Sequence, residues 1–358
     1  MCGDVMLGRG IDQILACPCD PTLHEGYIQD ARDYVGIAED VSGPIPTGVG
    51  PEYPWGDALS ILNAKRPDVR IINLETSITC SNTYEPDKGI HYRVSPQNAS
   101  ALEAAHIDVC ALANNHVLDW GTAGLLDTLS KLDELGIARC GAGREPEEAV
   151  RPAVIELGER GRVLVFGVGG VDAGVPFSWA AAEGQPGVFV VQEFDEVAAR
   201  RVSEAIEPWR RKDTIIVLSV HWGSNWGFSV PAQHRWFAHR MIDAGVHVLH
   251  GHSSHHVKGI EVREGHPILY GCGDLLTDYE GIQGHQIYRG DLGLLYLVTV
   301  DEAGTLTQLE MVPTQMRRFQ VRRPGAPEVC WLANTIAETG ELLGSTVALE
   351  GDTLKLRW

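Results

Sequence analysis

Short apolar runs alternate with segments of helical periodicity along most of the chain. We expect strands in the apolar runs, at Arg70–Leu74, Val109–Ala113, Arg162–Val168, Thr214–Val220, Val246–Leu249, Pro267–Gly271 and Leu294–Val300. We expect helices at Trp55–Ala64, Gln97–Ala105, Gly121–Leu135, Asp195–Arg211 and Ala232–Ala244. Most of the expected strands are continuous runs of Val, Ile and Leu, which is typical of sheets covered on both faces. The alternation therefore predicts an α/β protein.

Two stretches depart from this alternation. The segment Cys17–Tyr53 is rich in Pro, Gly and Asp and has no clear period, so we expect a long excursion over the surface, with a lid as one interpretation. From Gln308 onward, prolines interrupt the pattern, which indicates an appended region. We therefore expect a main domain at residues 1–305 and a C-terminal extension packed on it at residues 306–358.

The charge of the chain limits its partners. Of its 358 residues, 29 are Lys or Arg and 48 are Asp or Glu, which gives a net charge of −19. The resulting negative electrostatic potential disfavours binding to nucleic acid and to anionic membranes, because phosphate binding needs a basic face. The first residues have no apolar signal-peptide core, and no run reaches the ~18 apolar residues of a membrane helix. We therefore expect a cytoplasmic protein with no signal peptide and no membrane anchor.

The 8 cysteines are scattered, and no pair repeats with the spacing of a zinc ribbon. We expect reduced, mostly structural thiols in a cytoplasmic protein. The motif Cys17-Pro18-Cys19 is a weak signal for a redox pair.

Five polar clusters lie at or just after apolar runs, where strand ends meet loops and α/β proteins place their sites. They are Gly3-Asp4, Asn73-Leu74-Glu75, Asn114-Asn115-His116 with Asp119, His221-Trp222-Gly223 and Gly251-His252-Ser253-Ser254-His255-His256. Six of their side chains offer a mixed oxygen and nitrogen ligand set: Asp4, Glu75, Asn115, His221, His252 and His255. Such a set predicts one or two divalent ions, such as Mn, Zn, Fe or Ca. With two ions, a carboxylate would bridge them and both would polarise one substrate oxygen.

Each cluster also has an ordinary structural explanation. Asp4 by itself is compatible with a turn or a helix N-cap, and the two asparagines before His116 are compatible with a turn. His247 and His250 are flanked by Val and Leu, so we expect them to be strand residues with internal partners. Taken singly each motif is weak, whereas the whole series in this order is a strong signal.

In this order the clusters resemble the CapA family of poly-gamma-glutamate (capsule) synthesis, within the calcineurin-like metallophosphatase superfamily. The resemblance runs from Gly3 to about Val300. It implies a four-layer α/β/β/α sandwich that forms the catalytic domain at residues 1–305. It also implies that the six side chains above are metal ligands and that His116, oriented by Asp119, is an acid/base group. The usual Asp-x-His start of metallophosphatases reads Asp4-Val5-Met6 here, so one ion has lost an imidazole ligand.

The expected activity is the epimerisation of a peptide at Cα. The missing anchor makes the chain similar to the cytoplasmic family branch found with lasso peptides, whose members epimerise the C-terminal residue of a ribosomal precursor. Such a reaction needs two acid/base groups, for which we nominate His116 and His285, with Asp12 and Asp274 in reserve. Candidate substrate-binding residues are Trp222, Trp226 and Phe228 for an aromatic side chain, and Arg93 or Arg289 for a carboxylate. Core packing for the aromatic residues and a plain surface position for His285 are the ordinary alternatives.

Two other functions stay open. A metal-dependent hydrolase would cleave a phosphoester, or an amide in poly-gamma-glutamate metabolism, with His116 protonating the leaving group. A non-catalytic protein would bind a peptide or polymer and need no acid/base pair. In every case we expect a peptide or polyglutamate-like partner rather than nucleic acid, and a homo-oligomer is left open.

Overall fold

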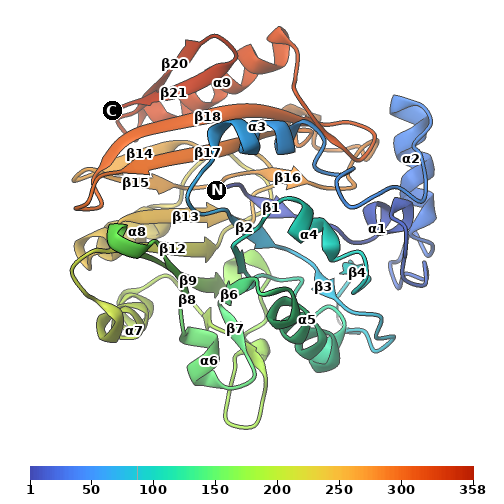
Figure 1. Ribbon diagram of the computed structural model, residues 1–358, viewed down its shortest axis with the longest axis horizontal. Coiled ribbons are helices and arrows are strands. Elements are labelled where there is room, and N and C mark those ends of the chain that lie inside the picture. Colours follow the sequence, from blue (N-terminus) through green and yellow to red (C-terminus); the bar gives the residue numbers. More distant parts are fainter. Residues whose placement is uncertain (87) are drawn as a thin grey trace.

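The structure is a computed structural model that describes residues 1–86 and 88–358, and two central sheets form its frame (Figure 1). The first is parallel, in the order β16-β1-β2-β5-β6. Its strands are β1 (Asp4–Val5), β2 (Ile71–Leu74), β5 (Val109–Ala111), β6 (Ala138–Cys140) and β16 (Asp274–Leu276). The second is mixed, in the order β11-β9-β12-β13-β15-β14, with β8 antiparallel to β9. Its strands are β8 (Ala153–Glu156), β9 (Arg162–Gly170), β11 (Val190–Val191), β12 (Thr214–His221), β13 (Val248–His252), β14 (Ile260–Arg263) and β15 (His266–Leu269).

A third, antiparallel sheet contains the C-terminal strands and lies at the red end of the colour scale in Figure 1. Its strands are β17 (Leu292–Val300), β18 (Leu306–Met316), β19 (Val321–Arg322), β20 (Thr346–Glu350) and β21 (Thr353–Arg357). Two short ribbons complete the strands: β3 (Ser77–Ile78) with β4 (Arg93–Val94), and β7 (Ala142–Gly143) with β10 (Gly187–Val188). The expected boundary after residue 305 falls in the turn between β17 and β18. The division into two domains stays a prediction.

The helices flank these sheets. They are α1 (Gly10–Ile14), α2 (Arg32–Ser42), α3 (Asp57–Lys65), α4 (Ser100–Ala104), α5 (Gly121–Leu135), α6 (Pro146–Val150), α7 (Glu196–Ile206), α8 (Ala232–Asp243) and α9 (Ala326–Glu341). Short 3-10 turns lie at Gly158–Arg160, Val171–Ala173, Phe177–Trp179, Glu207–Trp209 and Gln286–Tyr288. Within residues 1–86 and 88–358, no helix has the length and apolar character needed to cross a membrane.

The core explains why the strands are apolar on both faces. One buried cluster combines side chains of both central sheets, such as Val109 of β5 and Val217 of β12. The other face of the parallel sheet packs with α3, α4 and α5, for example through Leu129, and that of the mixed sheet packs with α7 and α8, for example through Phe237. The predicted α/β class is thereby confirmed, whereas assignment to the metallophosphatase sandwich stays a prediction.

All seven expected strands and all five expected helices are present, with ends shifted by a few residues. The helix expected at Asp195–Arg211 ends at Ile206, because Pro208 lacks the N–H that would continue it, and a 3-10 turn at Glu207–Trp209 follows instead. The expectation of an irregular Cys17–Tyr53 excursion is wrong in part, because this segment contains α2. That helix buries only Tyr34 and Ala38, four residues apart, so its apolar stripe is too narrow to stand out among polar neighbours.

Candidate metal centre

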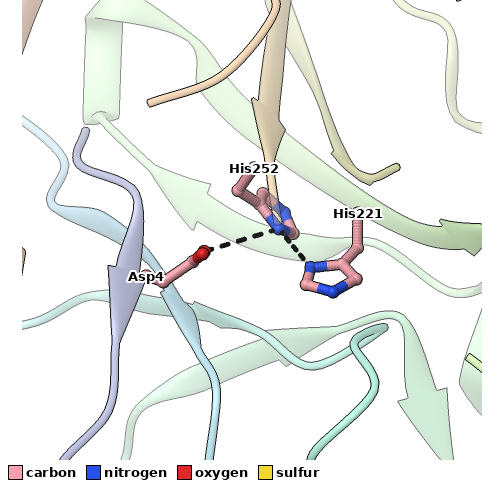
Figure 2. Close-up of side chains that lie close together, drawn as sticks. All are labelled: Asp4, His221 and His252. Atoms are coloured by element: carbon pink, nitrogen blue, oxygen red, sulfur yellow. Dashed lines mark hydrogen bonds and ion pairs between the residues drawn. The ribbon is translucent and has the colours of Figure 1, made fainter. Parts of the chain in front are cut away.

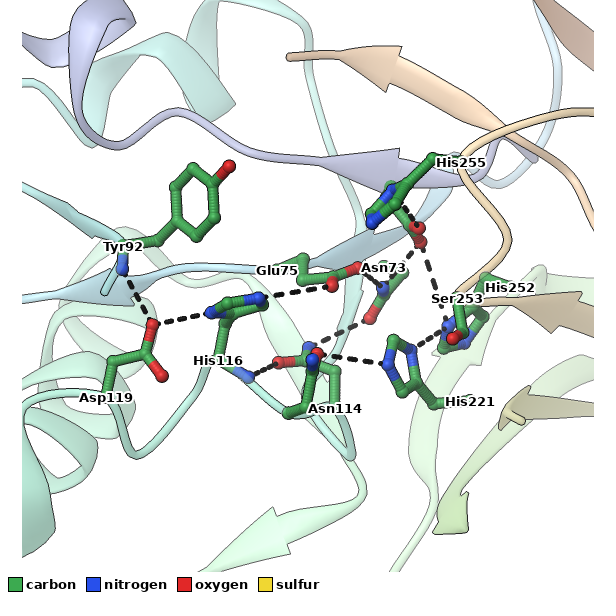
Figure 3. A network of polar contacts seen from close by, with 12 residues as sticks. Asn73, Glu75, Tyr92, Asn114, His116, Asp119, His221, His252, Ser253 and His255 are labelled. Atoms are coloured by element: carbon green, nitrogen blue, oxygen red, sulfur yellow. Dashed lines mark hydrogen bonds and ion pairs between the residues drawn. The ribbon is translucent and has the colours of Figure 1, made fainter. Parts of the chain in front are cut away.

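Figure 3 shows four of the predicted ligands, Glu75, His221, His252 and His255, near the ends of strands from the two central sheets. In the parallel sheet Asp4 of β1 is in register with Asn73 of β2, and in the mixed sheet His221 of β12 is in register with His252 of β13. Because the carboxyl ends of parallel strands meet at one edge of a sheet, side chains far apart in sequence come together there. The two sheets present these edges to the same site.

A first group consists of Asp4, His221 and His252 (Figure 2). The Nδ1 atoms of His221 and His252 lie 2.9 Å apart, and Nδ1 of His252 lies 3.9 Å from Oδ1 of Asp4. The other ring nitrogen of His252 contacts the Ser219 hydroxyl at 2.8 Å, which fixes the orientation of the ring. All three ligand atoms lie within 4.8 Å of one another and are buried. This arrangement suits a divalent ion bound by two imidazoles and a carboxylate.

A second group shares Asp4 with the first and adds His255 and Asp274. Nδ1 of His255 lies 2.9 Å from Oδ1 of Asp274 and 3.9 Å from Oδ2 of Asp4. The phenol oxygen of Tyr279 lies 3.5 Å from Nε2 of the same imidazole. Asp4 therefore presents one oxygen to each group, as the carboxylate of a two-ion site would.

The backbone is shaped to bring these side chains together. A Cβ on Gly3 would lie 1.7 Å from the carbonyl oxygen of Gly273, so only glycine allows β1 to approach the segment before β16. Ser253 has φ 97, although it is not a glycine, and its hydroxyl donates to the carbonyl of Gly223 at 3.2 Å. Unfavourable backbone of this kind persists where surrounding contacts hold it, and here it lies directly after His252.

Two asparagines connect the acidic ligands. The amide nitrogen of Asn73 donates to Oδ1 of Asp4 at 2.7 Å and to Oε2 of Glu75 at 2.9 Å. The side chain of Asn114 in turn donates to Oδ1 of Asn73 at 2.9 Å, which orients the Asn73 amide so that its nitrogen points toward the two carboxylates. The predicted ligand Asn115 reaches the site from the other side, with Oδ1 3.2 Å from Nε2 of His221.

The residues of the predicted acid/base pair, His116 and Asp119, lie beside the predicted ligands. Nδ1 of His116 lies 2.6 Å from Oδ2 of Asp119, and Nε2 lies 3.8 Å from Oε1 of Glu75. The same Asp119 oxygen accepts from the backbone N–H of Tyr92 at 2.7 Å, and its other oxygen is paired with Lys88. Burial lowers the pKa of His116 to about 4, against the opposing charge of Asp119. The imidazole is therefore neutral, and Asp119 orients it with Nε2 toward Glu75, one of the predicted ligands.

The electrostatics of the site fit a bound cation. Burial and the neighbouring Asp274 raise the pKa of Asp4 to about 7, and burial with Asp4 raises the pKa of Glu75. Burial likewise lowers the pKa of His221, which keeps its ring in the neutral form that binds metal ions. Among the residues that the structure describes, Oδ2 of Asp4 and Oδ2 of Asp274 are buried with no hydrogen-bond partner. Crowded carboxylates with orphaned oxygens are costly by themselves and are compensated by a divalent cation.

The candidate substrate-binding residues lie in different settings. Trp226 is half-buried and stacks on the exposed His285, with ring centroids 4.1 Å apart, and its ring also lies 5.6 Å from that of His255. Trp222 lies in the core cluster of the mixed sheet, where its Nε1 donates to the carbonyl of Tyr270. Phe228 and Trp226 both lie against the ring of Tyr288, with ring centroids 5.1 Å and 5.4 Å away, respectively.

The two candidate arginines both donate hydrogen bonds to groups of the protein itself. Arg93 is buried and donates to the carbonyls of Ser81 and Asp20. Arg289 donates to both oxygens of Asp291. The reserve base Asp12 accepts three hydrogen bonds, from the backbone of Cys19 and Ser95 and the side chain of Asn98. The catalytic, ligand and substrate-binding roles of all these residues stay predictions.

Sequence reasoning missed the supporting residues. The sequence indicates Asp274 only as a reserve base, although Asp274 directly follows an apolar run and two glycines, which is the kind of position that the predicted ligands occupy. Lys88 and Tyr92 lie in a segment without periodicity, and nothing local to them indicates that they contact Asp119. Asn73 was seen within its motif, but its role as the link between two carboxylates depends on the register of β1 and β2.

Comparison with known proteins agrees with the order of the motifs. The model of the family described as bacterial capsule synthesis protein PGA_cap matches residues 1–279. A protein of Mycobacterium tuberculosis named as a probable polyglutamine synthesis accessory protein is 45% identical over 98% of this chain and 93% of its own length. The PGA biosynthesis protein CapA of Bacillus subtilis is 28% identical over 58% of this chain and 52% of its own. The capsule biosynthesis protein CapA of Bacillus anthracis is 28% identical over 55% and 46%, respectively.

Proposed function

The chain belongs to the bacterial capsule synthesis protein family, and on that premise we propose that it is a metal-dependent hydrolase of amide bonds in a glutamyl polymer or peptide. The names of its relatives refer to polyglutamine and to PGA, and residues in such polymers are joined by amide bonds. We also propose that its two central sheets form the calcineurin-like four-layer sandwich. The cytoplasmic location and the oligomeric state stay predictions.

The observation that carries the proposal is the pair of buried groups that share Asp4. His221 and His252 complete one group, and His255 and Asp274 complete the other. Divalent cations held there would polarise the substrate carbonyl and supply a water molecule of lowered pKa. Neither a purely structural core nor a simple peptide-binding surface requires acidic oxygens that are buried without a hydrogen-bond partner.

The residues beside this pair supply proton transfer. Asp119 accepts from Nδ1 of His116, so the tautomer leaves Nε2 free to exchange a proton with substrate. Glu75 lies 3.8 Å from that nitrogen and is itself held by Asn73. In amide hydrolysis the difficult step is departure of the amine. The unprotonated Nε2 of His116 would first take a proton from the attacking water and would then deliver it to the amine, which makes the amine a leaving group.

Epimerisation at Cα is a second candidate, although the names of the relatives do not support it. One observation favours it. Trp226 stacks on His285 and also lies against His255, so a second imidazole approaches the ligands from a different segment than His116 does. Two such groups are what removal and return of a Cα proton on opposite faces would need.

The test is incubation of the Mn²⁺-loaded protein with poly-gamma-glutamate and with glutamine-rich peptides in D2O. Hydrolysis predicts new free amines and shorter chains, with a loss of at least 100-fold in His116→Asn, the scale of a lost acid/base group. His106→Asn is the matched control, because His106 is exposed and its positive φ suits asparagine. Deuterium at Cα with unchanged chain length would instead support epimerisation. Release of phosphate from phosphoesters alone, or tight binding without turnover, would contradict the proposal.

A further inference from the structure

Two cysteines from segments far apart in the sequence lie close together near the short ribbon of β3 and β4. Cys19 follows α1, and Cys80 follows β3 after one intervening residue. Their sulfur atoms lie 3.2 Å apart, although 61 positions separate them in the sequence. The S–S bond of a disulfide is about 2.0 Å long, so only a small movement is needed to form one.

Hydrogen bonds from neighbouring groups keep the two cysteine segments close together. The guanidinium of Arg93 donates to the carbonyl of Asp20 at 2.8 Å and to that of Ser81 at 2.6 Å. Asp20 and Ser81 are the residues that directly follow the two cysteines. The backbone N–H of Cys19 donates to the buried carboxylate of Asp12 at 2.7 Å. The two segments therefore lie side by side whether or not their sulfur atoms are bonded.

This pairing differs from the one that the sequence indicated. In Cys17-Pro18-Cys19, Cys17 is exposed and its backbone N–H donates to Asn98. Its sulfur makes no contact with that of Cys19 among the contacts that the structure describes. Cys80, in contrast, is exposed and touches the buried Cys19. One accessible thiol thus stands directly against one protected thiol.

We propose that Cys19 and Cys80 form a reversible disulfide, with a peroxide as the oxidant. The sulfur of the exposed Cys80 attacks one oxygen of hydrogen peroxide and becomes a sulfenic acid, and the thiol proton passes to the departing hydroxide, which leaves as water. The sulfur of Cys19 then attacks the sulfur of Cys80, the S–S bond forms and a second water leaves. Two thiols are oxidised and one peroxide is reduced. Burial and the charge of Asp12 raise the pKa of Cys19, so Cys80 is the thiol that meets the oxidant first.

The bond would join two segments that both lead to the site. Beyond Cys19, the carboxylate of Glu25 accepts from the guanidinium of Arg9 at 3.0 Å. That guanidinium lies over the ring of Tyr92, whose backbone N–H donates to Asp119. Beyond Cys80, Lys88 is paired with Asp119, the partner of the predicted acid/base residue. Closing a loop of this length restricts the unfolded and opened chain more than the folded one. The oxidised protein is therefore expected to unfold at a higher urea concentration than the reduced protein.

The test is peptide mapping of the full chain after treatment with hydrogen peroxide and alkylation of the remaining thiols. We expect one linked peptide pair containing Cys19 and Cys80, which dithiothreitol separates, and an increase in the urea midpoint that dithiothreitol reverses. Cys330→Ser is the matched control, because Cys330 is also exposed but lies on α9, and it should keep both results. Cys80→Ser should lose both.

Other outcomes would overturn the proposal. A linkage of Cys17 to Cys19 or to Cys80 would assign the chemistry to the short motif instead. Oxidation of Cys80 alone, to sulfinic or sulfonic acid with Cys19 still alkylated, would show that the buried thiol does not resolve the sulfenic acid. A Cys19→Ser variant makes these results interpretable, since it should accumulate a sulfenic acid at Cys80 that dimedone traps.

Discussion

Replacing Asp4 by asparagine separates two effects of this carboxylate: its destabilisation of the metal-free fold and its contribution to metal binding. Asp4 is fully buried and shares the hydrogen bonds of Asn73 with Glu75, so its charge is poorly compensated in the metal-free protein. Its pKa rises from 3.8 to about 7, chiefly because of burial and then because of Asp274. A carboxyl with a higher pKa in the folded than in the unfolded chain destabilises the fold when it ionises. This cost is absent below the unfolded pKa, grows as the pH rises and is complete above about pH 7.

The size of the effect follows from that pKa. A rise from 3.8 to about 7 corresponds to about 4 kcal/mol, since each pKa unit is worth about 1.4 kcal/mol. At a pH above the folded pKa, metal-free Asp4→Asn should therefore be more stable than the parent protein by up to about 4 kcal/mol. Excess ion at about 100 times its Kd adds about 2.7 kcal/mol to a protein with an intact site, so with metal the advantage of the variant should shrink to about 1 kcal/mol.

Urea unfolding in EDTA and in Mn²⁺ measures both effects. Asp40→Asn is the matched control, because Asp40 is exposed on α2 and the substitution should change neither value. The reasoning is refuted if metal-free Asp4→Asn is less stable than the parent protein above the pKa of Asp4. It is also refuted if Mn²⁺ stabilises both proteins equally.

Three further predictions address other parts of the structure. Gly3→Ala should lower the free energy of unfolding by about 1–3 kcal/mol and abolish stabilisation by Mn²⁺, because the added Cβ would lie 1.7 Å from a backbone oxygen. Gly26→Ala is the control in the same urea assay and should have neither effect, because a Cβ there would have nothing within 4 Å. Asp119→Asn should keep the metal content measured by elemental analysis but lose roughly 10- to 100-fold in rate, and loss of the metal would contradict its assigned role. Glu261→Gln should cost roughly 1–2 kcal/mol at neutral pH, a value discounted because Arg235 is partly exposed. Although burial opposes it, contact with Arg235 lowers the pKa of Glu261, so the difference should vanish as the pH falls through that lowered pKa, and a constant difference would be inconsistent with it.

Much of the fold could be predicted from the period of apolar residues. Strands β9 and β12 are long apolar runs, and α5 has a regular apolar stripe, so each was located from local sequence alone. The shortest elements were not found, because β3 and β4 have two residues each and depend on pairing with each other. Helix α2 was missed because only one narrow stripe of it is buried.

Some contacts of the candidate site could likewise be predicted from the sequence, and others could not. The motifs that contain Asp4, His221 and His252 stand at strand ends, so their meeting could be expected from the topology of parallel strands. The contact of Lys88 with Asp119 and the pairing of Cys19 with Cys80 join segments that have no periodic pattern. Such contacts are set by how the loops pack on the finished sheets, which local sequence does not encode.

The central claim is that the two groups sharing Asp4 bind divalent cations. Anomalous diffraction from crystals grown with Mn²⁺ tests it most directly, with crystals of Asp4→Asn as the reference. We expect anomalous peaks within bonding distance of His221 and His252 on one side of Asp4 and of His255 and Asp274 on the other, both weakened in the variant. Peaks confined to the protein surface, or ligand side chains that turn away from Asp4 in the presence of the ion, would contradict it.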